Sequence, residues 1–226
     1  KYHTLFNIKF VCKNSKNSAE KTNFVFEMCH QNSKKTITGV YGGSFNPIHV
    51  GHVSMAKEIL RLSLVDEMWL VVSPQNPLKN EGLWNDDFRL NLARLAVSDI
   101  PGVEVSDVEF SLPKPNYMLT TLEVLSARHP DREFVLVIGM DNWLCFHRWY
   151  KWESILQRYR LIVLPRRSEQ EQEEGEDGMN RQLPAGARVH FAEVSLIDIS
   201  STWIRAEISE NPSYEGQGLP DGVWDR

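Results

Sequence analysis

The sequence predicts an open α/β fold in which helices cover both faces of a parallel β-sheet. Two observations lead to this prediction. Short apolar segments alternate along the chain with segments whose apolar residues recur at helical spacing. The apolar segments are also continuous, without regular polar positions, which is typical of parallel strands buried on both faces. Ligands of such sheets bind at the carboxyl ends of the strands, so we expect the functional site there.

Five segments are expected as strands. ITGVY, at 37–41, leads into a Gly-rich turn, and EMWLVV, at 67–72, ends at the Pro-rich loop SPQNPLKN. VEVSDVEF, at 103–110, is expected as a strand or a hairpin. EFVLVIG, at 133–139, and RLIVLP, at 160–165, are expected as buried strands.

Helices are expected between and after these strands. Apolar residues recur at helical spacing in VSMAKEILRL, at 53–62, and the segment Trp84–Ser98 places Phe88 and Leu92 on one side. The other expected helices lie at Met118–Arg128, at 153–159 and at 203–209.

Composition narrows the class of protein. The chain has 226 residues, 42% of them hydrophobic and 24% charged, which suits one soluble domain. Its net charge of −5 gives no basic field for nucleic acid. Its three cysteines form no CxxC pair, which argues against disulfides and a cysteine zinc site and favours a reducing compartment. Without a membrane-spanning run or a signal peptide pattern, we expect a cytoplasmic protein that binds no membrane.

Two segments stand apart from the α/β pattern. Residues 1–35 are rich in Lys, Asn and Ser, and we expect them to be a poorly ordered extension. The extension is either sequence that precedes an internal start at Met28 or part of the native protein. The alternative is an extra strand pair packed on the domain. We expect residues 36–226 to form a single domain, within which 166–186 are an acidic surface loop. An acidic lid is the alternative for that loop.

The segment GGSFNPIHVGH, from Gly42 to His52, follows the first expected strand and opens a helix. Gly42 and Gly43 let the backbone approach a ligand closely. The helix start directs unpaired N–H groups and a partial positive charge into the same space, and His49 and His52 add imidazole donors. The pattern indicates an anion site, whereas a plain turn or a two-histidine metal site has less support.

A second helix start, in ISSTWIR from Ile199 to Arg205, has the same features. Ser200 or Ser201 is a suitable N-cap, and Thr202 adds a hydroxyl group. One turn further, Arg205 provides a planar guanidinium that fits phosphate oxygens. Alone, the segment is equally compatible with an ordinary capped surface helix.

Aromatic residues crowd the segment IGMDNWLCFHRWYKW, which follows the expected strand at 133–139. Most of them are expected in the core, but one exposed ring could stack on a flat base, and a pyridinium would gain further from the ring face. Asp141 lies just past the strand end, where a carboxylate can accept ribose hydroxyl groups.

These motifs together resemble the bacterial nicotinate-mononucleotide adenylyltransferases, a branch of the nucleotidyltransferase superfamily with the HxGH motif. The resemblance covers roughly Lys35 to the C-terminus and implies a Rossmann-like nucleotidyltransferase fold. It implies transfer of AMP from ATP to nicotinate mononucleotide in NAD biosynthesis. The catalytic residues that it implies are His49, His52 and Arg205. Those that it implies for ATP are Gly42, Gly43, Ser44, Phe45, Asp141, Ile199, Ser200 and Thr202, and those for the mononucleotide are Lys79, Tyr117, Met118, Trp149 and Tyr150.

The sequence departs from the family pattern at two places. Met118 stands where the family usually has a Thr that helps to hold the pyridine carboxylate, so the preference for nicotinate over nicotinamide is open. In SPQNPLK, Leu78 replaces the family's His, while Lys79 is retained near the phosphates. His147 has no role that the family assigns.

The implied reaction is attack by a mononucleotide phosphate oxygen on the α-phosphorus of ATP. This nucleophile is already an anion, so no general base is needed, and catalysis should come from positioning and charge stabilisation. Mg²⁺ should be carried by the ATP phosphates and water, and we name no metal ligand. The alternatives are a nicotinamide-mononucleotide, pantetheine-phosphate or other nucleotidyltransferase, and a non-catalytic nucleotide sensor. The oligomeric state is left open, homo-oligomers included.

Overall fold

A computed structural model describes residues 34–74, 82–165, 183–194, 197 and 199–224. The chain divides into two compact units, Lys1–Lys34 and Lys35–Arg226, and the description below concerns the second. The N-terminal extension expected at 1–35 and the acidic loop expected at 166–186 lie almost wholly outside the described residues, as does Lys79.

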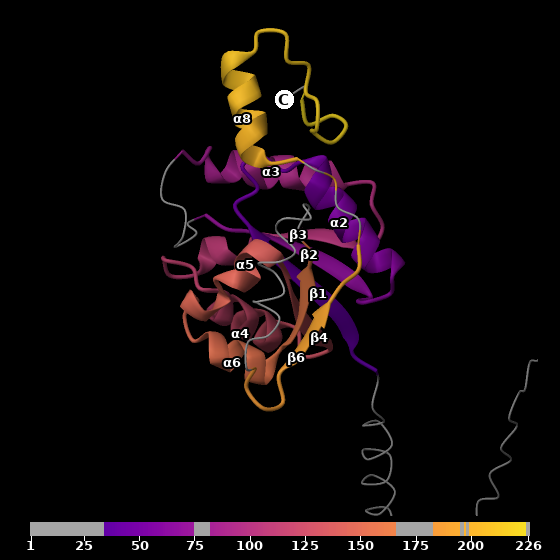
Figure 1. Cartoon of the computed structure of the whole chain (residues 1–226), viewed down its shortest axis with the longest axis vertical. Helices are drawn as coiled ribbons and strands as arrows, with labels where there is room; N and C mark the ends of the chain where they lie inside the picture. The colour runs from indigo at the N-terminus through magenta and orange to yellow at the C-terminus, as the bar shows by residue number, and fades with distance from the viewer. Residues whose placement is uncertain (1–33, 75–81, 166–182, 195–196, 198, 225–226) are drawn as a thin grey trace, which may run out of the picture. The chain divides into compact units, whose positions relative to one another are not determined.

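The second unit is built on a parallel sheet of six strands in the order β3-β2-β1-β4-β5-β6 (Figure 1). This is the doubly wound order in which the chain starts in the middle of the sheet and turns to the other half after β3. The strands are β1 (Thr36–Gly43), β2 (Glu67–Val72), β3 (Val103–Ser106), β4 (Arg132–Gly139), β5 (Arg160–Leu164) and β6 (Arg188–Phe191). The predicted fold class is therefore confirmed.

Helices cover both faces of this sheet. One face packs against α2 (Val50–Arg61) and α3 (Asp86–Val97). The other packs against α4 (Met118–Arg128), α5 (Met140–Leu144) and α6 (Trp152–Arg158). The other helices in the described part of the chain are the short 3₁₀ turns η1 (Val108–Ser111) and η2 (Phe146–Arg148), and α8 (Ser201–Glu210).

The strands divide their side chains between two hydrophobic clusters, as the pleat requires. In β2, Met68 and Leu70 join the cluster under α2 and α3, whereas Trp69 and Val71 join the cluster under α4 to α6. Successive residues of β2 point to opposite faces of the sheet, and both faces are covered by helices. Residues that point to either face therefore have apolar contacts. This explains why β2 is a continuous apolar run in the sequence.

The segment 103–110 confirms the strand alternative of its prediction over Val103–Ser106 and not the hairpin alternative. The strand β3 ends at Ser106, and a 3₁₀ turn follows at Val108–Ser111, so there is no hairpin. The Ser106 hydroxyl accepts the backbone N–H of Val108 at 3.3 Å, a local bond that competes with further strand pairing. The edge strand β6 was not predicted, because exposed polar residues alternate with apolar residues within its four positions and leave no continuous apolar run.

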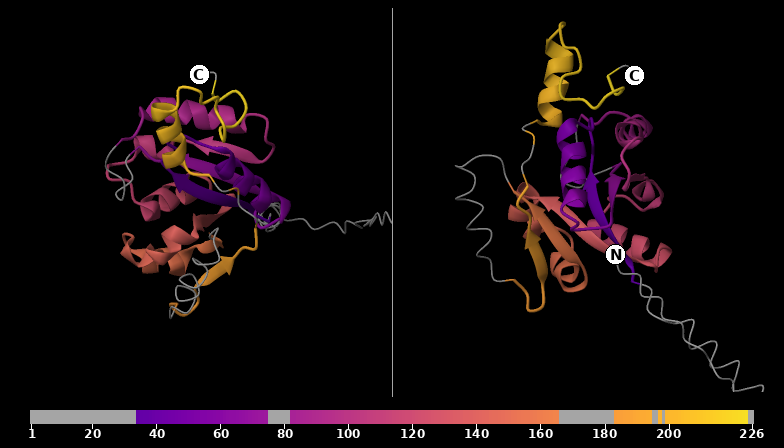
Figure 2. Two further views of the ribbon diagram at one scale, coloured as in Figure 1. Left: turned by 45° about the horizontal axis from the view of Figure 1, so that its top comes forward. Right: turned by 90° about the vertical axis from the view of Figure 1, so that its right-hand side faces the viewer.

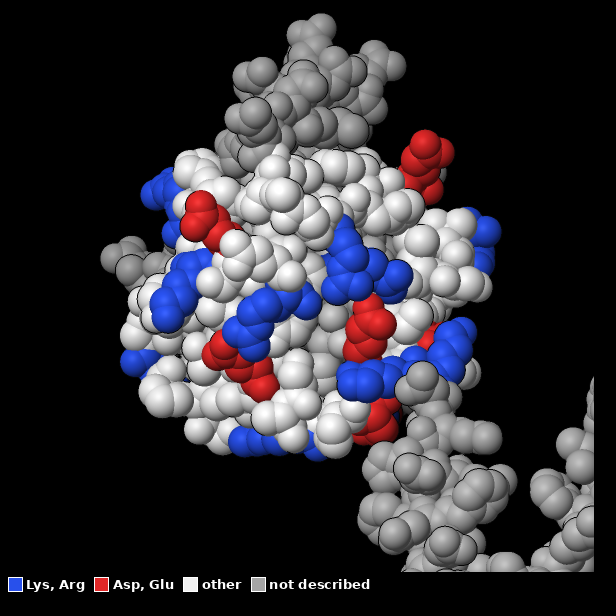
Figure 3. Space-filling model, turned by 90° about the horizontal axis from the view of Figure 1, so that it is seen from below, with Lys and Arg blue, Asp and Glu red and all other residues white. Residues whose placement is uncertain are grey.

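The C-terminal helix α8 and the segment after it lie at the carboxyl ends of the strands, beside the start of α2 (Figure 2). The opposite face of the unit, at the amino ends of the strands, shows basic and acidic side chains intermingled (Figure 3). There Arg132 pairs with Glu67 at 2.8 Å and with Asp131 at 2.7 Å. Among the described residues, no helix combines the length and apolarity needed to cross a bilayer.

Candidate functional site

The loop between β1 and α2 is tightly folded at its first turn. Phe45 adopts a left-handed backbone conformation with φ of 43°, which is costly for a residue with a side chain and persists only where neighbours enforce it. Its ring lies against Gly43, where a Cβ atom would come within 3.0 Å of the Phe45 ring. A side chain at position 43 would press on the Phe45 ring of the same loop, which favours glycine there. Ser44, between them, is buried.

The two predicted histidines lie together at the start of α2. His49 is the N-cap, and its ring stacks on that of His52 with centroids 3.7 Å apart. His52 Nδ1 accepts the backbone N–H of His49 at 3.3 Å, half of a reciprocal capping box. Since Nδ1 accepts, the proton of the neutral ring is placed on Nε2, which makes that nitrogen a donor.

The start of α8 packs directly on this loop. Arg205 Nη1 donates to the carbonyl oxygen of Asn46 at 2.7 Å, although the two residues are 159 positions apart. Ser201 Oγ donates to the carbonyl oxygen of Pro47 at 2.9 Å. The structure therefore brings the two predicted anion-binding segments, GGSFNPIHVGH and ISSTWIR, into contact.

Other contacts of the C-terminal segment close the same region. The backbone N–H of Val50 donates to the carbonyl of Gly218 at 2.9 Å. Ile199 packs so closely that a Cβ on Gly51 would come within 3.0 Å of it. Two helix N-termini, two imidazoles and a guanidinium thus gather at the carboxyl end of β1, next to the point where the sheet order reverses.

The α8 start shows which serine is its cap. Ser200 is the N-cap and accepts the backbone N–H of Trp203 at 3.1 Å. Thr202 is exposed, and its hydroxyl accepts from Arg205 Nη2 at 3.4 Å. The predicted residues Ser200, Thr202 and Arg205 therefore lie at the N-cap and within the first turns of one helix.

A cavity opens beside the end of β1, between the sheet and the helices α4 and α6. Its walls include four residues predicted to bind a mononucleotide, namely Tyr117, Met118, Trp149 and Tyr150. The Tyr117 and Tyr150 rings lie 4.6 Å apart, and Trp149 packs on the buried Phe146. The other lining residues are Gly42, Gly43, Ser73, Glu109, Asn116, Asn142, Arg148 and Ile155.

Met118 occupies the junction between the cavity and the loop. Its terminal methyl lies over Gly42, where a Cβ atom would be only 2.4 Å from it. Gly42 therefore makes room for the side chain that replaces the family's Thr. Met118 is also the first residue of α4, whose N-cap Tyr117 makes no side-chain capping bond. The opening amides of α4 remain suited to an anionic group.

The aromatic cluster divides between core and cavity, as expected for such clusters. Trp143 is buried in the core and Trp152 packs against it, whereas Trp149 lines the cavity and Tyr150 is 46% exposed. Asp141 lies where it was expected, in the first turn after β4, and is exposed.

Sequence reasoning missed the polar wall of the cavity. Glu109, only 3% exposed, accepts the Thr121 hydroxyl at 2.7 Å, and Asn116 donates to the Glu109 carbonyl at 3.0 Å. Burial raises the pKa of the Glu109 carboxyl, and hydrogen bonds from Thr121 and Ser73 partly offset this effect. The only signal in the sequence was an acidic residue between the apolar Val108 and Phe110.

Among the described residues, no group of three or more His, Cys, Asp or Glu side chains gathers as a metal site would require. The donors beside the loop are nitrogen and hydroxyl groups. Their arrangement suits an extended anion such as a triphosphate, and the neighbouring aromatic cavity suits a flat ring.

Comparisons with known proteins agree with this arrangement. The cytidylyltransferase-like family model matches residues 40–207. A Bacteroides fragilis protein named "Probable nicotinate-nucleotide adenylyltransferase" is 43% identical over 176 residues, which cover 77% of this chain and 83% of that relative. A Bacteroides thetaiotaomicron protein of the same name is 42% identical over 85% of this chain and 91% of its own length. The solved nicotinic acid mononucleotide adenylyltransferase of Plasmodium falciparum, complexed with NaAD, superposes with a TM-score of 0.61 at 18% identity, covering 78% of this chain and 85% of that one.

Proposed function

This chain belongs to the nicotinate-nucleotide adenylyltransferase family, and on that premise we propose that it transfers AMP from ATP to nicotinate mononucleotide. The products are deamido-NAD and pyrophosphate, in NAD biosynthesis. One observation carries the proposal: the loop bearing His49 and His52 is in contact with the Arg205 helix and borders an aromatic cavity through Gly42 and Gly43.

In this reaction a phosphate oxygen of the mononucleotide attacks the α-phosphorus of ATP. The new P–O bond forms as the bond from that phosphorus to the bridging oxygen breaks, and pyrophosphate carries away the electron pair. The nucleophile is already anionic, so it needs no general base. His49, His52 and Arg205 instead donate hydrogen bonds to the negative charge that develops on the oxygens around the phosphorus. The Nε2–H of His52 and the guanidinium of Arg205 supply directed donors, and the starts of α2 and α8 add their dipoles.

ATP lies along the first turn and the α8 start in this proposal. The main chain of Gly42–Phe45 approaches the phosphates, and Ile199, Ser200 and Thr202 line the α8 side. Asp141, exposed at the end of β4, accepts hydroxyl groups on the adenosine side. ATP enters as its magnesium complex, with Mg²⁺ held by phosphates and water, because magnesium retains its waters and uses few protein ligands.

The mononucleotide occupies the aromatic cavity. Trp149, with Tyr150 and Tyr117 beside it, offers ring faces to the pyridinium, and Met118 lies at the junction with the ATP side. Without the family's Thr hydroxyl, the pyridine carboxylate is held by the opening amides of α4. Lys79 is assigned to the mononucleotide by resemblance alone.

We place this reaction in the cytoplasm, with small molecules as partners and neither nucleic acid nor membrane involved. Residues 36–226 act as one catalytic domain, with 1–35 as an extension and 166–186 as a surface loop.

The test is a panel of acceptors with ATP and Mg²⁺, followed by pyrophosphate release. We expect turnover with nicotinate mononucleotide, less with nicotinamide mononucleotide, and none with pantetheine phosphate. Turnover with only pantetheine phosphate would assign the chain to another branch of the superfamily. ATP binding without pyrophosphate release from any acceptor would make it a nucleotide sensor.

A further inference from the structure

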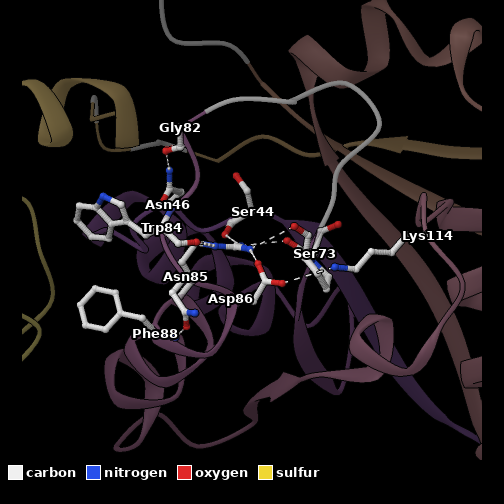
Figure 4. Close-up of polar contacts among 11 residues, drawn as sticks. Ser44, Asn46, Ser73, Gly82, Trp84, Asn85, Asp86, Phe88 and Lys114 are labelled. Atoms are coloured by element: carbon white, nitrogen blue, oxygen red, sulfur yellow. Dashed lines mark hydrogen bonds and ion pairs between the residues drawn. The ribbon is translucent and has the colours of Figure 1, made fainter.

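The side chain of Arg89 is fully buried, at 0% exposure, one turn into α3. A guanidinium has five N–H donors, and all five have acceptors here (Figure 4). Nε donates to the Trp84 carbonyl at 3.0 Å, Nη1 to the carbonyls of Ser44 and Ser73, and Nη2 to the Pro74 carbonyl and Asp86 Oδ1. Four of the five acceptors are main-chain carbonyls.

These carbonyls belong to three separate segments. Ser44 lies in the loop after β1, Ser73 and Pro74 follow β2, and Trp84 leads into α3. Burying a cation carries a desolvation penalty that pairing only offsets, and apolar side chains of similar volume often stabilise such a site as well or better. What Arg89 adds is a rigid set of directed donors that fixes three segments against one another.

Asn46 joins two of these segments, the loop after β1 and the stretch leading into α3, a second time. Its side chain donates to the Gly82 carbonyl at 2.9 Å and accepts the Trp84 N–H at 3.0 Å, while its own carbonyl accepts from Arg205. Ser44 and Asn46, held in this way, flank Phe45 and its left-handed conformation. The Phe45 ring in turn meets the His52 ring edge-on with centroids 5.0 Å apart.

We propose that Arg89 is a positioning residue of the transfer reaction, which by holding the carbonyls of Ser44, Ser73 and Trp84 fixes the loop that orients His52 and Arg205. This inference rests on the proposed function. The ion pair to Asp86, which is 38% exposed, and the 3.7 Å contact of Asp86 with Lys114 are secondary, because exposed pairs contribute little. The carbonyl contacts carry the effect.

The test compares Arg89→Lys with Arg94→Lys in the whole chain. Lysine keeps the positive charge, but its three N–H donors are all on one nitrogen atom and cannot reach five acceptors. Arg94 is a matched control on the same helix, 48% exposed and paired with Asp107 at 2.9 Å. We expect Arg89→Lys to lower kcat at least tenfold, with the KM of either substrate changed less than threefold. The ¹H–¹³C signals of the His52 ring should shift in Arg89→Lys and stay in place in Arg94→Lys.

A folded Arg89→Lys protein with kcat within threefold of wild type and unshifted His52 signals would overturn the inference. If circular dichroism shows that Arg89→Lys does not fold, Arg89→Met replaces it, because an uncharged side chain of similar length fills the space without burying a cation and without the donors to the carbonyls of Ser44, Ser73 and Trp84. The kcat of this variant should fall at least tenfold, and a wild-type kcat would again overturn the inference. Absence of turnover in the wild type would instead refute the proposed function, and the His52 signals would still test the role of Arg89.

Discussion

The loop after β1 and the neighbouring cavity are held in opposite ways. The loop is fixed by hydrogen bonds that the side chains of Arg89, Asn46 and Arg205 donate to main-chain carbonyl groups. Most of its geometry is therefore independent of any ligand. The cavity is walled by side chains, several of them exposed, and Met118 shows that one of them differs from the family pattern. We infer that the geometry on the phosphate side depends on a fixed loop backbone, whereas the choice of acceptor depends on side chains that can be replaced. We therefore expect loop variants to change kcat and cavity variants to change acceptor binding.

The largest effect is expected from His52→Ala. Removing one preorganised donor to transition-state charge costs about 100-fold or more in rate. Steady-state pyrophosphate release should show this loss in kcat, with little change in either KM. His190→Ala, an exposed histidine on β6, is the control and should be silent. A loss of less than about tenfold, or under about 1.4 kcal/mol, would mean that the imidazole is not a transition-state donor.

Trp149→Ala tests the cavity side of the comparison. Loss of the ring face for a pyridinium should raise the KM for nicotinate mononucleotide about tenfold, while kcat and the KM for ATP change little. Trp149→Phe keeps a ring and should recover most of the affinity. An equal change in both KM values would show that Trp149 supports the whole site and does not contact the acceptor.

Met118→Thr addresses acceptor choice at the point where the two regions meet. A restored hydroxyl can donate to a carboxylate, and one hydrogen bond contributes about 1 kcal/mol. The ratio of kcat/KM for nicotinate over nicotinamide mononucleotide should therefore rise about fivefold. Met118→Val, which has a similar shape without the hydroxyl, should leave the ratio where it is. If both variants change it alike, the size of residue 118 controls selectivity.

The smallest effect concerns stability, through Glu109 in the cavity wall. Its raised pKa means that the folded protein retains this proton to higher pH than the unfolded chain does. The contribution of Glu109 to the free energy of unfolding should therefore be fully present below about pH 4.5, the ordinary value for Glu, and be lost as pH rises through the raised pKa. Glu109→Gln removes this titration, so its stability relative to wild type should rise from acid to neutral pH in urea titrations. A difference that is constant with pH would contradict the assignment.

The same contrast explains what could be predicted from the sequence. The segments GGSFNPIHVGH and ISSTWIR are readable because glycine, caps and helix starts impose local backbone geometry, and both were found. The strand β2 was predicted with its correct bounds because burial on both faces leaves a continuous apolar run. Arg89 and Glu109 could not be found, because their partners come from distant segments and nothing local marks a charged residue as buried. β6 was missed because a short edge strand carries exposed polar residues.

The hydrogen bonds from Arg205 to Asn46 and from Val50 to Gly218 join stretches that are synthesised far apart in time. A nascent chain on the ribosome can pair its first strands, but it cannot close the start of α2 until residues near Gly218 have left the exit tunnel. Competence for the reaction therefore has to wait until Arg205, which is made 159 residues after Asn46, has been translated.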